Sequence, residues 1–165
     1  MAVDKSVIGT PTGKSRIVIE RGPVSVFAKA VKDSSPIYSD PSAAAAAGFD
    51  RIPVPPTYGF AMGYWGGFAE AQPADDPARN RNPVMEIIGG LMKQGGVVLH
   101  GEQEFVYHRP IMVGDVLLGE GKVVDFYERE SRGKTMTFLV TETVYRDEKT
   151  GAPALTTRMN LIHRK

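Results

Sequence analysis

The sequence predicts a single α+β domain in which an antiparallel sheet is wrapped around one long central helix. Helical patterns occupy the first half of the chain, and strand patterns joined by short turns fill the second half, as expected for an antiparallel sheet packed against helices. The chain has 165 residues, of which 42% are hydrophobic, and this is enough for one core. We therefore expect one domain over residues 1–165, with residues 1–10 as an N-terminal tail.

The first elements are a short strand and two helices. Residues 16–20 form a β-branched run, and residues 21–23 break it and favour a helix start. Apolar residues then recur at the spacing i, i+3, i+4, i+7 across residues 24–31, which predicts a helix with one apolar face. A turn over residues 33–36 and a short helix over residues 41–47 complete this part.

The central helix is expected over Tyr58–Glu70. The preceding stretch Ile52–Pro56 contains three prolines and cannot be helical throughout, and Thr57 is a suitable N-cap. Apolar side chains occur nearly all round the helix, at Phe60, Ala61, Met62, Tyr64, Trp65 and Phe68. A helix of this kind is buried on most sides. The polar, proline-containing residues 72–82 should form a loop.

Four strands are predicted in the second half. Apolar side chains alternate with others over residues 135–144, although Glu142 interrupts the apolar face, and the alternation returns over residues 155–161. Two further strands are expected at Val97–His108 and Val116–Tyr127, with short turns between them. We expect these four strands to form a meander in which each pairs with its neighbour in sequence.

Composition argues against several function classes. Lys and Arg number 20 against 19 Asp and Glu, so no broad basic surface is expected for nucleic acid. The chain has no cysteine, and the spacing of His100, His108 and His163 does not indicate a metal site. Neither a targeting segment nor an apolar run of roughly 20 residues is present. We therefore expect a cytoplasmic protein that does not associate with a membrane and that binds neither a metal nor a cofactor.

Three segments resemble one enzyme family. They are Lys32–Tyr38 with Ala47–Phe49, then Pro55–Tyr58, then Leu99–Pro110 with Gly114 and Asp115. Together they resemble the MaoC-like (R)-specific hydratases and dehydratases, specifically the N-terminal, fatty-acid-synthase-type branch with the HadA-like subunits of (3R)-hydroxyacyl-ACP dehydratases. The resemblance extends from about residue 10 to the end of the chain. It implies the hot-dog fold, a role in fatty-acid metabolism, an acyl-CoA or acyl-ACP thioester as substrate, and a homodimer or a heterodimer.

The motif of this family is G-D-x-N-P-x-H, and its Asp and His act together in adding water to a double bond beside a thioester. Here Asp33 stands at the Asp position, whereas Lys32, Ser35 and Tyr38 replace Gly, Asn and His. A phenol of pKa about 10 exchanges protons at neutral pH far less readily than an imidazole of pKa about 6.5. The resemblance therefore implies a subunit with degenerate catalytic positions Asp33 and Tyr38, completed by a catalytic hot-dog partner.

Further candidate residues lie beside the motif and at the start of the central helix. The N–H groups at a helix N-terminus can hold a carbonyl oxygen on which negative charge develops. The candidate substrate-binding residues are Ser35, Pro56, Thr57, Tyr58, Gly59, Met62, Trp65 and His100. His100 and His108 are eight residues apart on one predicted strand, so they should project from the same sheet face.

Structural explanations compete with several of these assignments. Asp33 suits a turn, the apolar residues of the central helix belong to a core by default, and Arg51, Lys93 and Arg109 are more often solvated charges than phosphate ligands. Four functions therefore stay open. They are a degenerate acyl-binding subunit of a dehydratase, a self-sufficient hydratase that uses Asp33, a non-catalytic acyl-binding or scaffold protein, and a hot-dog thioesterase.

Overall fold

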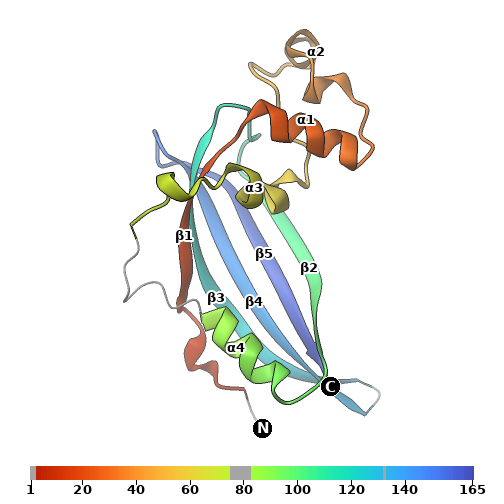
Figure 1. Cartoon of the computed structure of the whole chain (residues 1–165), viewed down its shortest axis with the longest axis vertical. Helices are drawn as coiled ribbons and strands as arrows, with labels where there is room; N and C mark the ends of the chain where they lie inside the picture. The colour runs from red at the N-terminus through yellow and green to blue at the C-terminus, as the bar shows by residue number, and fades with distance from the viewer. Residues whose placement is uncertain (1–2, 75–82, 132) are drawn as a thin grey trace.

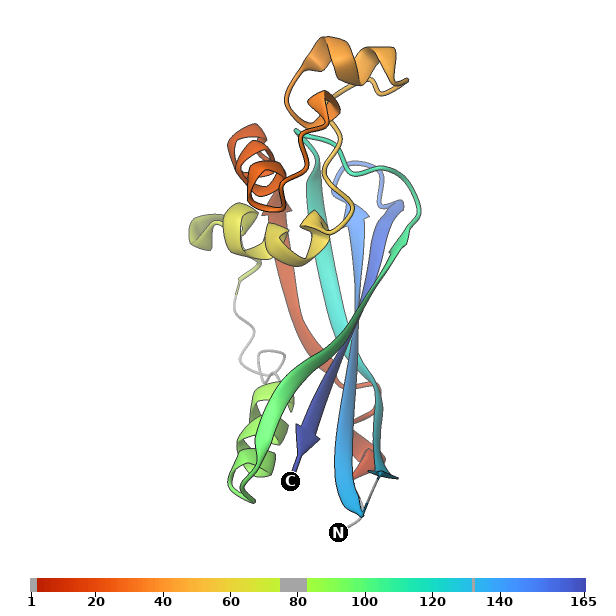
Figure 2. The same cartoon turned by 90° about the vertical axis from the view of Figure 1, so that its right-hand side faces the viewer.

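A five-stranded antiparallel sheet forms one layer of the molecule, and helices α1, α3 and α4 lie on one of its faces (Figures 1 and 2). The computed structural model describes residues 3–74, 83–131 and 133–165. The strands are β1 (Pro11–Val18), β2 (Val97–Tyr107), β3 (Val116–Ser131), β4 (Lys134–Asp147) and β5 (Pro153–Arg164). The helices are α1 (Arg21–Ala30), α2 (Pro41–Ala46), α3 (Tyr58–Gly66) and α4 (Pro83–Met92), with 3-10 turns at Lys5–Val7, Pro36–Tyr38 and Ala69–Ala71. The predicted α+β class is confirmed.

The strand order is β1-β3-β4-β5-β2, which differs from the predicted four-stranded meander. The last three strands do follow one another as hairpins, but β2 lies beside β5, in a register that runs from Val97 opposite Arg164 to Tyr107 opposite Leu155. The meander prediction is wrong because the link from β2 to β3, residues 108–115, crosses the end of the sheet instead of turning back on itself (Figure 2).

The central helix predicted over Tyr58–Glu70 is shorter in the structure, and a 3-10 turn over Ala69–Ala71 follows it. Helix α3 ends at Gly66, and α4 covers the opposite end of the same sheet face (Figure 1). Gly66 lies so close to β1 that an added Cβ would meet the carbonyl oxygen of Val18. Of the loop predicted over residues 72–82, residues 75–82 lie outside the described part of the chain.

Helix α3 buries one face and exposes the other. Its buried residues are Tyr58, Gly59, Met62 and Gly66, which face the sheet. Phe60, Tyr64, Trp65 and Phe68 form an exposed apolar surface, which we call the α3 ridge, and the Tyr64 side chain is 79% exposed. The prediction that this helix is buried on most sides is therefore wrong for the single chain, because one layer of sheet covers one face of a helix.

Two apolar cores lie between the helices and the sheet. The larger core contains residues of β1, α1, α3 and β5, among them Ile17, Val24, Met62 and Leu155. The smaller core lies under α4 and contains Val84, Val123, Phe126 and Leu139. The described part of the predicted N-terminal tail is attached to the sheet, since the N–H of Gly9 donates to the carbonyl of Val123 at 2.8 Å.

Candidate functional site

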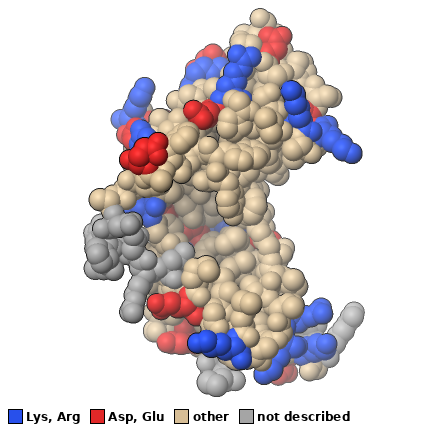
Figure 3. Space-filling model, in the orientation of Figure 1, with Lys and Arg blue, Asp and Glu red and all other residues tan. Residues whose placement is uncertain are grey.

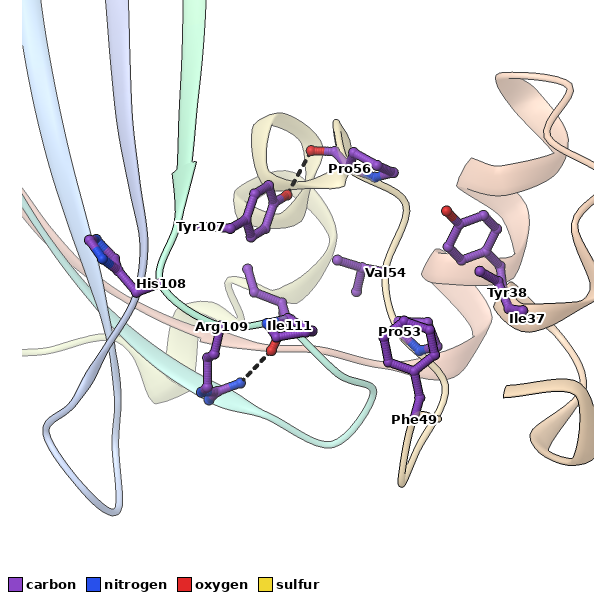
Figure 4. A pocket seen from close by; sticks show the side chains of 11 residues that line it. Ile37, Tyr38, Phe49, Pro53, Val54, Pro56, Tyr107, His108, Arg109 and Ile111 are labelled. Carbon is purple, nitrogen blue, oxygen red and sulfur yellow. Dashed lines mark hydrogen bonds between the residues drawn. The ribbon is translucent and has the colours of Figure 1, made fainter. Parts of the chain in front are cut away.

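A cavity of about 430 Å³ lies at the end of the sheet near α1 and α2 (Figure 4). Three segments that are far apart in sequence form its walls. Its lining residues are Ile37, Tyr38, Phe49, Pro53, Val54, Pro56, Tyr107, His108, Arg109, Pro110 and Ile111. Most of these side chains are apolar, so the cavity suits an apolar ligand with few polar groups.

Two extended segments meet along one wall of the cavity. The N–H of Val54 donates to the carbonyl of Ile111 at 3.0 Å, and Pro53 and Met112 form an isolated antiparallel bridge. Prolines lack an N–H group, so the proline-rich segment cannot continue this pairing as a full strand. The short pairing fixes both segments and leaves the side chains of Val54 and Ile111 on the cavity wall.

Tyr38 lies in this cavity and is 9% exposed. Its hydroxyl is turned toward the side of the cavity where Pro56 and Tyr107 lie (Figure 4), and it makes no hydrogen bond within the described part of the chain. Burial raises the pKa of the Tyr38 phenol, and the negative charge of Asp33 raises it further. At neutral pH Tyr38 therefore offers a hydrogen-bond donor to the cavity and not a base.

Tyr107 closes another side of the cavity. Its hydroxyl donates to the carbonyl oxygen of Pro56 at 2.6 Å (Figure 4). Burial raises the pKa of Tyr107 to about 12, with a further contribution from Tyr38. Tyr107 was not among the predicted site residues. Its alternation with Gln103 and Phe105 along β2 places these three side chains on one sheet face, and this pattern could have indicated it.

Asp33 lies beside the cavity and not in its lining. Its carboxylate oxygen Oδ1 accepts the N–H of Ser35 at 3.0 Å, and its own N–H donates to the carbonyl of Ala28 at 2.9 Å. The preceding Lys32 has a φ of 59°, in the left-handed region that glycine adopts without steric cost. Asp33 and Ser35 thus form the local turn that the structural explanation predicted.

The α3 N-terminus contributes one residue, Pro56, to the cavity. Thr57 is exposed and makes no side-chain cap, and the N–H of Tyr58 donates to the carbonyl of Pro55 at 2.9 Å. Tyr58 is fully buried, and its hydroxyl has no hydrogen-bond partner among the described residues. Gly59 packs against the sheet, where an added Cβ would meet side chains of β2 and β5. Thr57, Tyr58 and Gly59 are not among the residues that line this cavity, and their role in substrate binding stays a prediction.

Comparison with known sequences identifies the family. The sequence profile described as FAS1-like, dehydratase domain region, matches residues 6–157. The chain belongs to this family. It is also 35% identical over 120 residues to a UPF0336 protein of Streptomyces avermitilis, covering 71% of this chain and 69% of the relative. A UPF0336 protein of Saccharopolyspora erythraea is 35% identical over the same length, with 66% of the relative covered.

Solved structures of other proteins, among them several described as MaoC-like dehydratases, share the fold. The ChsH1–ChsH2 complex of Mycobacterium tuberculosis matches with a TM-score of 0.72 at 19% identity, covering 93% of this chain and 83% of that chain. The C-terminally truncated HadBC (3R-hydroxyacyl-ACP dehydratase) complex of the same organism matches with a TM-score of 0.63 at 18% identity, covering 94% and 98%. The hot-dog fold that the resemblance implied is confirmed.

Within the FAS1-like dehydratase fold, the other predicted binding residues lie outside the cavity lining. Met62 is fully buried in the larger core. Trp65 belongs to the α3 ridge and packs edge-on against Phe27, with ring centroids 6.1 Å apart. His100 lies on β2, where its ring centroid is 5.3 Å from that of Phe60. Of all predicted site residues, the cavity brings together Tyr38 and Pro56.

His100 and His108 do not share a sheet face. A β-bulge shifts the β2 register between His100 and Glu102, which reverses the alternation of side chains along the strand. His100 contacts Phe60 on the α3 side, whereas the His108 ring points away from the cavity (Figure 4) and its Nε2 lies 2.9 Å from Thr156 Oγ1.

Arg109 is held in an ion-pair network. The Asp115 carboxylate, which is 4% exposed, contacts Arg109 Nη1 at 2.6 Å and Arg51 Nη2 at 2.9 Å. Arg109 Nη2 also lies 2.8 Å from the carboxylate of Asp147. Hydrogen bonds from the Thr150 backbone lower the pKa of Asp147, which keeps it ionised beside Arg109. Arg51 and Arg109 were considered above as phosphate ligands or solvated charges. In the structure both guanidinium groups form ion pairs with Asp115 at the cavity end of the sheet.

Among the described residues, no helix has the length and hydropathy needed to cross a membrane.

Proposed function

We propose that this chain is the acyl-thioester-binding subunit of a (3R)-hydroxyacyl-thioester dehydratase or enoyl hydratase, and that its catalytic Asp and His come from a second hot-dog subunit. The observation that carries this proposal is the place of Tyr38. This residue occupies the His position of the family motif and lines an apolar cavity with a phenol of raised pKa. Such a phenol can donate a hydrogen bond but cannot take a proton from water at neutral pH.

The other ionisable groups around the cavity are engaged elsewhere. The carboxylate of Asp33 accepts the N–H of Ser35, the ring of His108 bonds Thr156, and the guanidinium of Arg109 is paired with two carboxylates. The lining of the cavity thus contains no carboxylate among its described residues, and its one histidine is hydrogen-bonded to Thr156. This supports a binding role that depends on another chain for the chemistry.

The cavity suits part of an acyl thioester. Small-molecule sites commonly measure about 300–1,000 Å³, and an apolar lining with a few polar groups is typical of them. In our proposal the apolar side chains Ile37, Phe49 and Val54 contact the acyl chain or the pantetheine arm. The Tyr38 hydroxyl donates a hydrogen bond to the thioester carbonyl. Coenzyme A or an acyl carrier protein then serves as the handle outside the cavity.

Two of the structural relatives are, by their names, complexes: ChsH1–ChsH2 and HadBC. That precedent supports a hot-dog partner for this chain. The exposed α3 ridge gives such a partner an apolar surface to cover.

Hydration of a medium-chain trans-2-enoyl-CoA tests the proposal. We expect the purified chain alone to bind the thioester without turning it over, and the chain co-expressed with a hot-dog subunit that bears the full Asp and His motif to be active. In the active complex, Tyr38→Phe should raise KM with a smaller change in kcat. Tyr127→Phe, far from the cavity on β3, is the matched control and should change neither constant.

Other outcomes select other functions. Activity of the chain alone that is abolished by Asp33→Asn would identify a self-sufficient hydratase and contradict the proposal. Binding of acyl-CoA without turnover in either preparation would instead indicate an acyl-binding or scaffold protein. Release of free coenzyme A without hydration would indicate a thioesterase.

A further inference from the structure

Three contacts hold the side chain of Tyr107 in place on the cavity wall. Its ring stacks on that of Phe105, with centroids 6.5 Å apart and an interplanar angle of 22°, and on β5 it stands opposite the buried Leu155. Phe105 is itself tightly packed, since an added Cβ at Gly59 of α3 would lie 3.2 Å from its ring. The Tyr107 hydroxyl is then fixed by its hydrogen bond to the Pro56 carbonyl at 2.6 Å. Tyr107 is therefore a preorganised polar group of the cavity.

The hydroxyl of Tyr107 has already used its one proton. A phenol has a single hydrogen to donate and lone pairs on its oxygen that accept. Because the hydrogen of Tyr107 is donated to the Pro56 carbonyl, the same oxygen can bind a ligand only as an acceptor. Burial raises the pKa of Tyr107 to about 12, so the hydroxyl stays protonated at neutral pH and keeps this bond.

Tyr38 has the complementary role in the same cavity. Its hydroxyl makes no hydrogen bond within the described part of the chain and is turned toward the side where Tyr107 lies (Figure 4). The contribution of Tyr38 to the raised pKa of Tyr107 agrees with this placement. The proton of Tyr38 is free for a ligand. The two phenols therefore present one donor and one acceptor.

The other polar side chains of the lining are engaged with the protein. The ring of His108 points away from the cavity (Figure 4), and its Nε2 lies 2.9 Å from Thr156 Oγ1. The guanidinium group of Arg109 is paired with Asp115 and Asp147. Among the described lining residues, Tyr38 and Tyr107 are thus the polar side chains best placed to determine which functional groups a ligand must carry.

A 3-hydroxyacyl thioester carries a matching pair of groups. Its thioester carbonyl accepts a hydrogen bond, and its hydroxyl, two carbons further along the chain, donates one. The 2-enoyl thioester that remains after loss of water keeps the carbonyl and has no donor. A 3-oxoacyl thioester has an oxygen on the same carbon as the hydroxyl, but this oxygen only accepts. A site built to bond a hydroxyl disfavours analogues that lack it.

We propose that the cavity prefers the 3-hydroxyacyl form of its ligand and that Tyr107 determines this preference: its oxygen accepts the hydrogen bond of the 3-hydroxyl, while Tyr38 donates to the thioester carbonyl. This inference rests on the proposed function. It adds to it which side of the hydration equilibrium the subunit binds more tightly and which residue recognises the difference.

Isothermal titration of the full chain with four coenzyme A thioesters of one chain length tests the inference. They are the octanoyl, trans-2-octenoyl, 3-oxooctanoyl and 3-hydroxyoctanoyl thioesters. We expect the 3-hydroxy ligand to bind about fivefold more tightly than the other three, the effect of one neutral hydrogen bond. Tyr107→Phe should remove this preference. Tyr38→Phe should weaken all four ligands by a similar factor, because all four carry the thioester carbonyl.

The ratio of affinities separates recognition from a structural effect. If Tyr107 only held Pro56 in place, Tyr107→Phe would weaken the four ligands equally and leave the preference for the 3-hydroxy ligand unchanged. Tyr64→Phe, on the exposed α3 ridge, is the matched control and should change no affinity. Thermal unfolding of each variant checks that the fold is kept. If Tyr107→Phe does not fold, the ratio between the 3-hydroxy and 3-oxo ligands in the wild type still decides.

Two kinds of failure can be told apart. Equal affinities of the wild type for the four ligands, or a preference that survives Tyr107→Phe, would overturn this inference and leave thioester binding intact. Absence of binding by all four thioesters would overturn the proposed function together with the inference.

Discussion

The two ends of the sheet each have an apolar core but differ in the contacts that accompany it. At the cavity end, main-chain and charged groups from distant segments touch directly: Gly66 lies against the carbonyl of Val18, and Asp115 is bound by two guanidinium groups. At the other end, α4 is held by apolar packing, such as that of Val84 in the core that contains Leu139. Backbone and ionic contacts tolerate little change in shape, whereas side-chain packing can adjust. Substitutions should therefore cost more at the cavity end than under α4.

The largest expected effect comes from Asp115→Asn. Its carboxylate holds Arg51 and Arg109 and also accepts the N–H of Met112 at 3.0 Å. Because the two arginine side chains are partly exposed, we expect a loss of about 2–3 kcal/mol in the free energy of unfolding, less than for a fully buried pair. Urea denaturation measures it. Glu148→Gln removes the surface pair with Arg16 and should cost at most about 1 kcal/mol. Equal losses in the two variants would contradict the comparison.

Replacing one glycine in α3 and one in α4 by alanine tests how closely each helix is packed. In α3, Gly66→Ala drives a Cβ against the Val18 carbonyl and to 2.9 Å from Ile17, so we expect a loss of about 1–3 kcal/mol. In α4, an added Cβ at Gly90 has no atom of the described chain within 4 Å. Gly90→Ala should therefore stabilise the protein by about 0.5–1 kcal/mol through helix propensity. Thermal and urea unfolding of both variants measure these changes. We expect the free energy of unfolding to fall in Gly66→Ala and to rise in Gly90→Ala.

The smallest effect is expected from Tyr107→Phe, which removes the hydrogen bond to Pro56 and should cost about 1 kcal/mol. The effect depends on pH. Burial raises the Tyr107 pKa from 10.0 to about 12, so the folded state keeps this proton more tightly than the unfolded state. The associated stability is complete below pH 10 and is lost as the pH rises through about 12.

Urea midpoints measured across the alkaline range test this dependence. The wild type should lose stability more steeply than Tyr107→Phe, while Tyr64→Phe, on the exposed ridge, should follow the wild type. Identical alkaline profiles for the wild type and Tyr107→Phe would show that burial of Tyr107 does not govern the loss.

Local sequence patterns predicted the class of the fold but not its connectivity. The strand periods and the turn residues are properties of neighbouring residues, and they located β3, β4 and β5. The pairing of β2 with β5 joins residues far apart in sequence, and a local pattern cannot reveal it. Helix α4 was missed although Val84, Ile87, Ile88 and Leu91 have helical spacing, because Gly89 and Gly90 interrupt the pattern.

The candidate site was predicted in part for the same reason. The motif led to Tyr38 and the proline-rich segment led to Pro56, and both line the cavity. The remaining wall comes from the link between β2 and β3, which reaches Pro53 only because that link crosses the end of the sheet. The faces of His100 and His108 depended on a single extra residue in a bulge, which an even spacing in sequence cannot show.

The side-chain amide of Gln72 covers part of the β1 edge of the sheet. It accepts the N–H of Arg16 at 2.9 Å and donates to the carbonyl of the same residue at 2.7 Å, as a neighbouring strand would do. A strand that added to β1 at this residue would have to displace Gln72, so its pairing there would replace two hydrogen bonds that the chain already makes to itself.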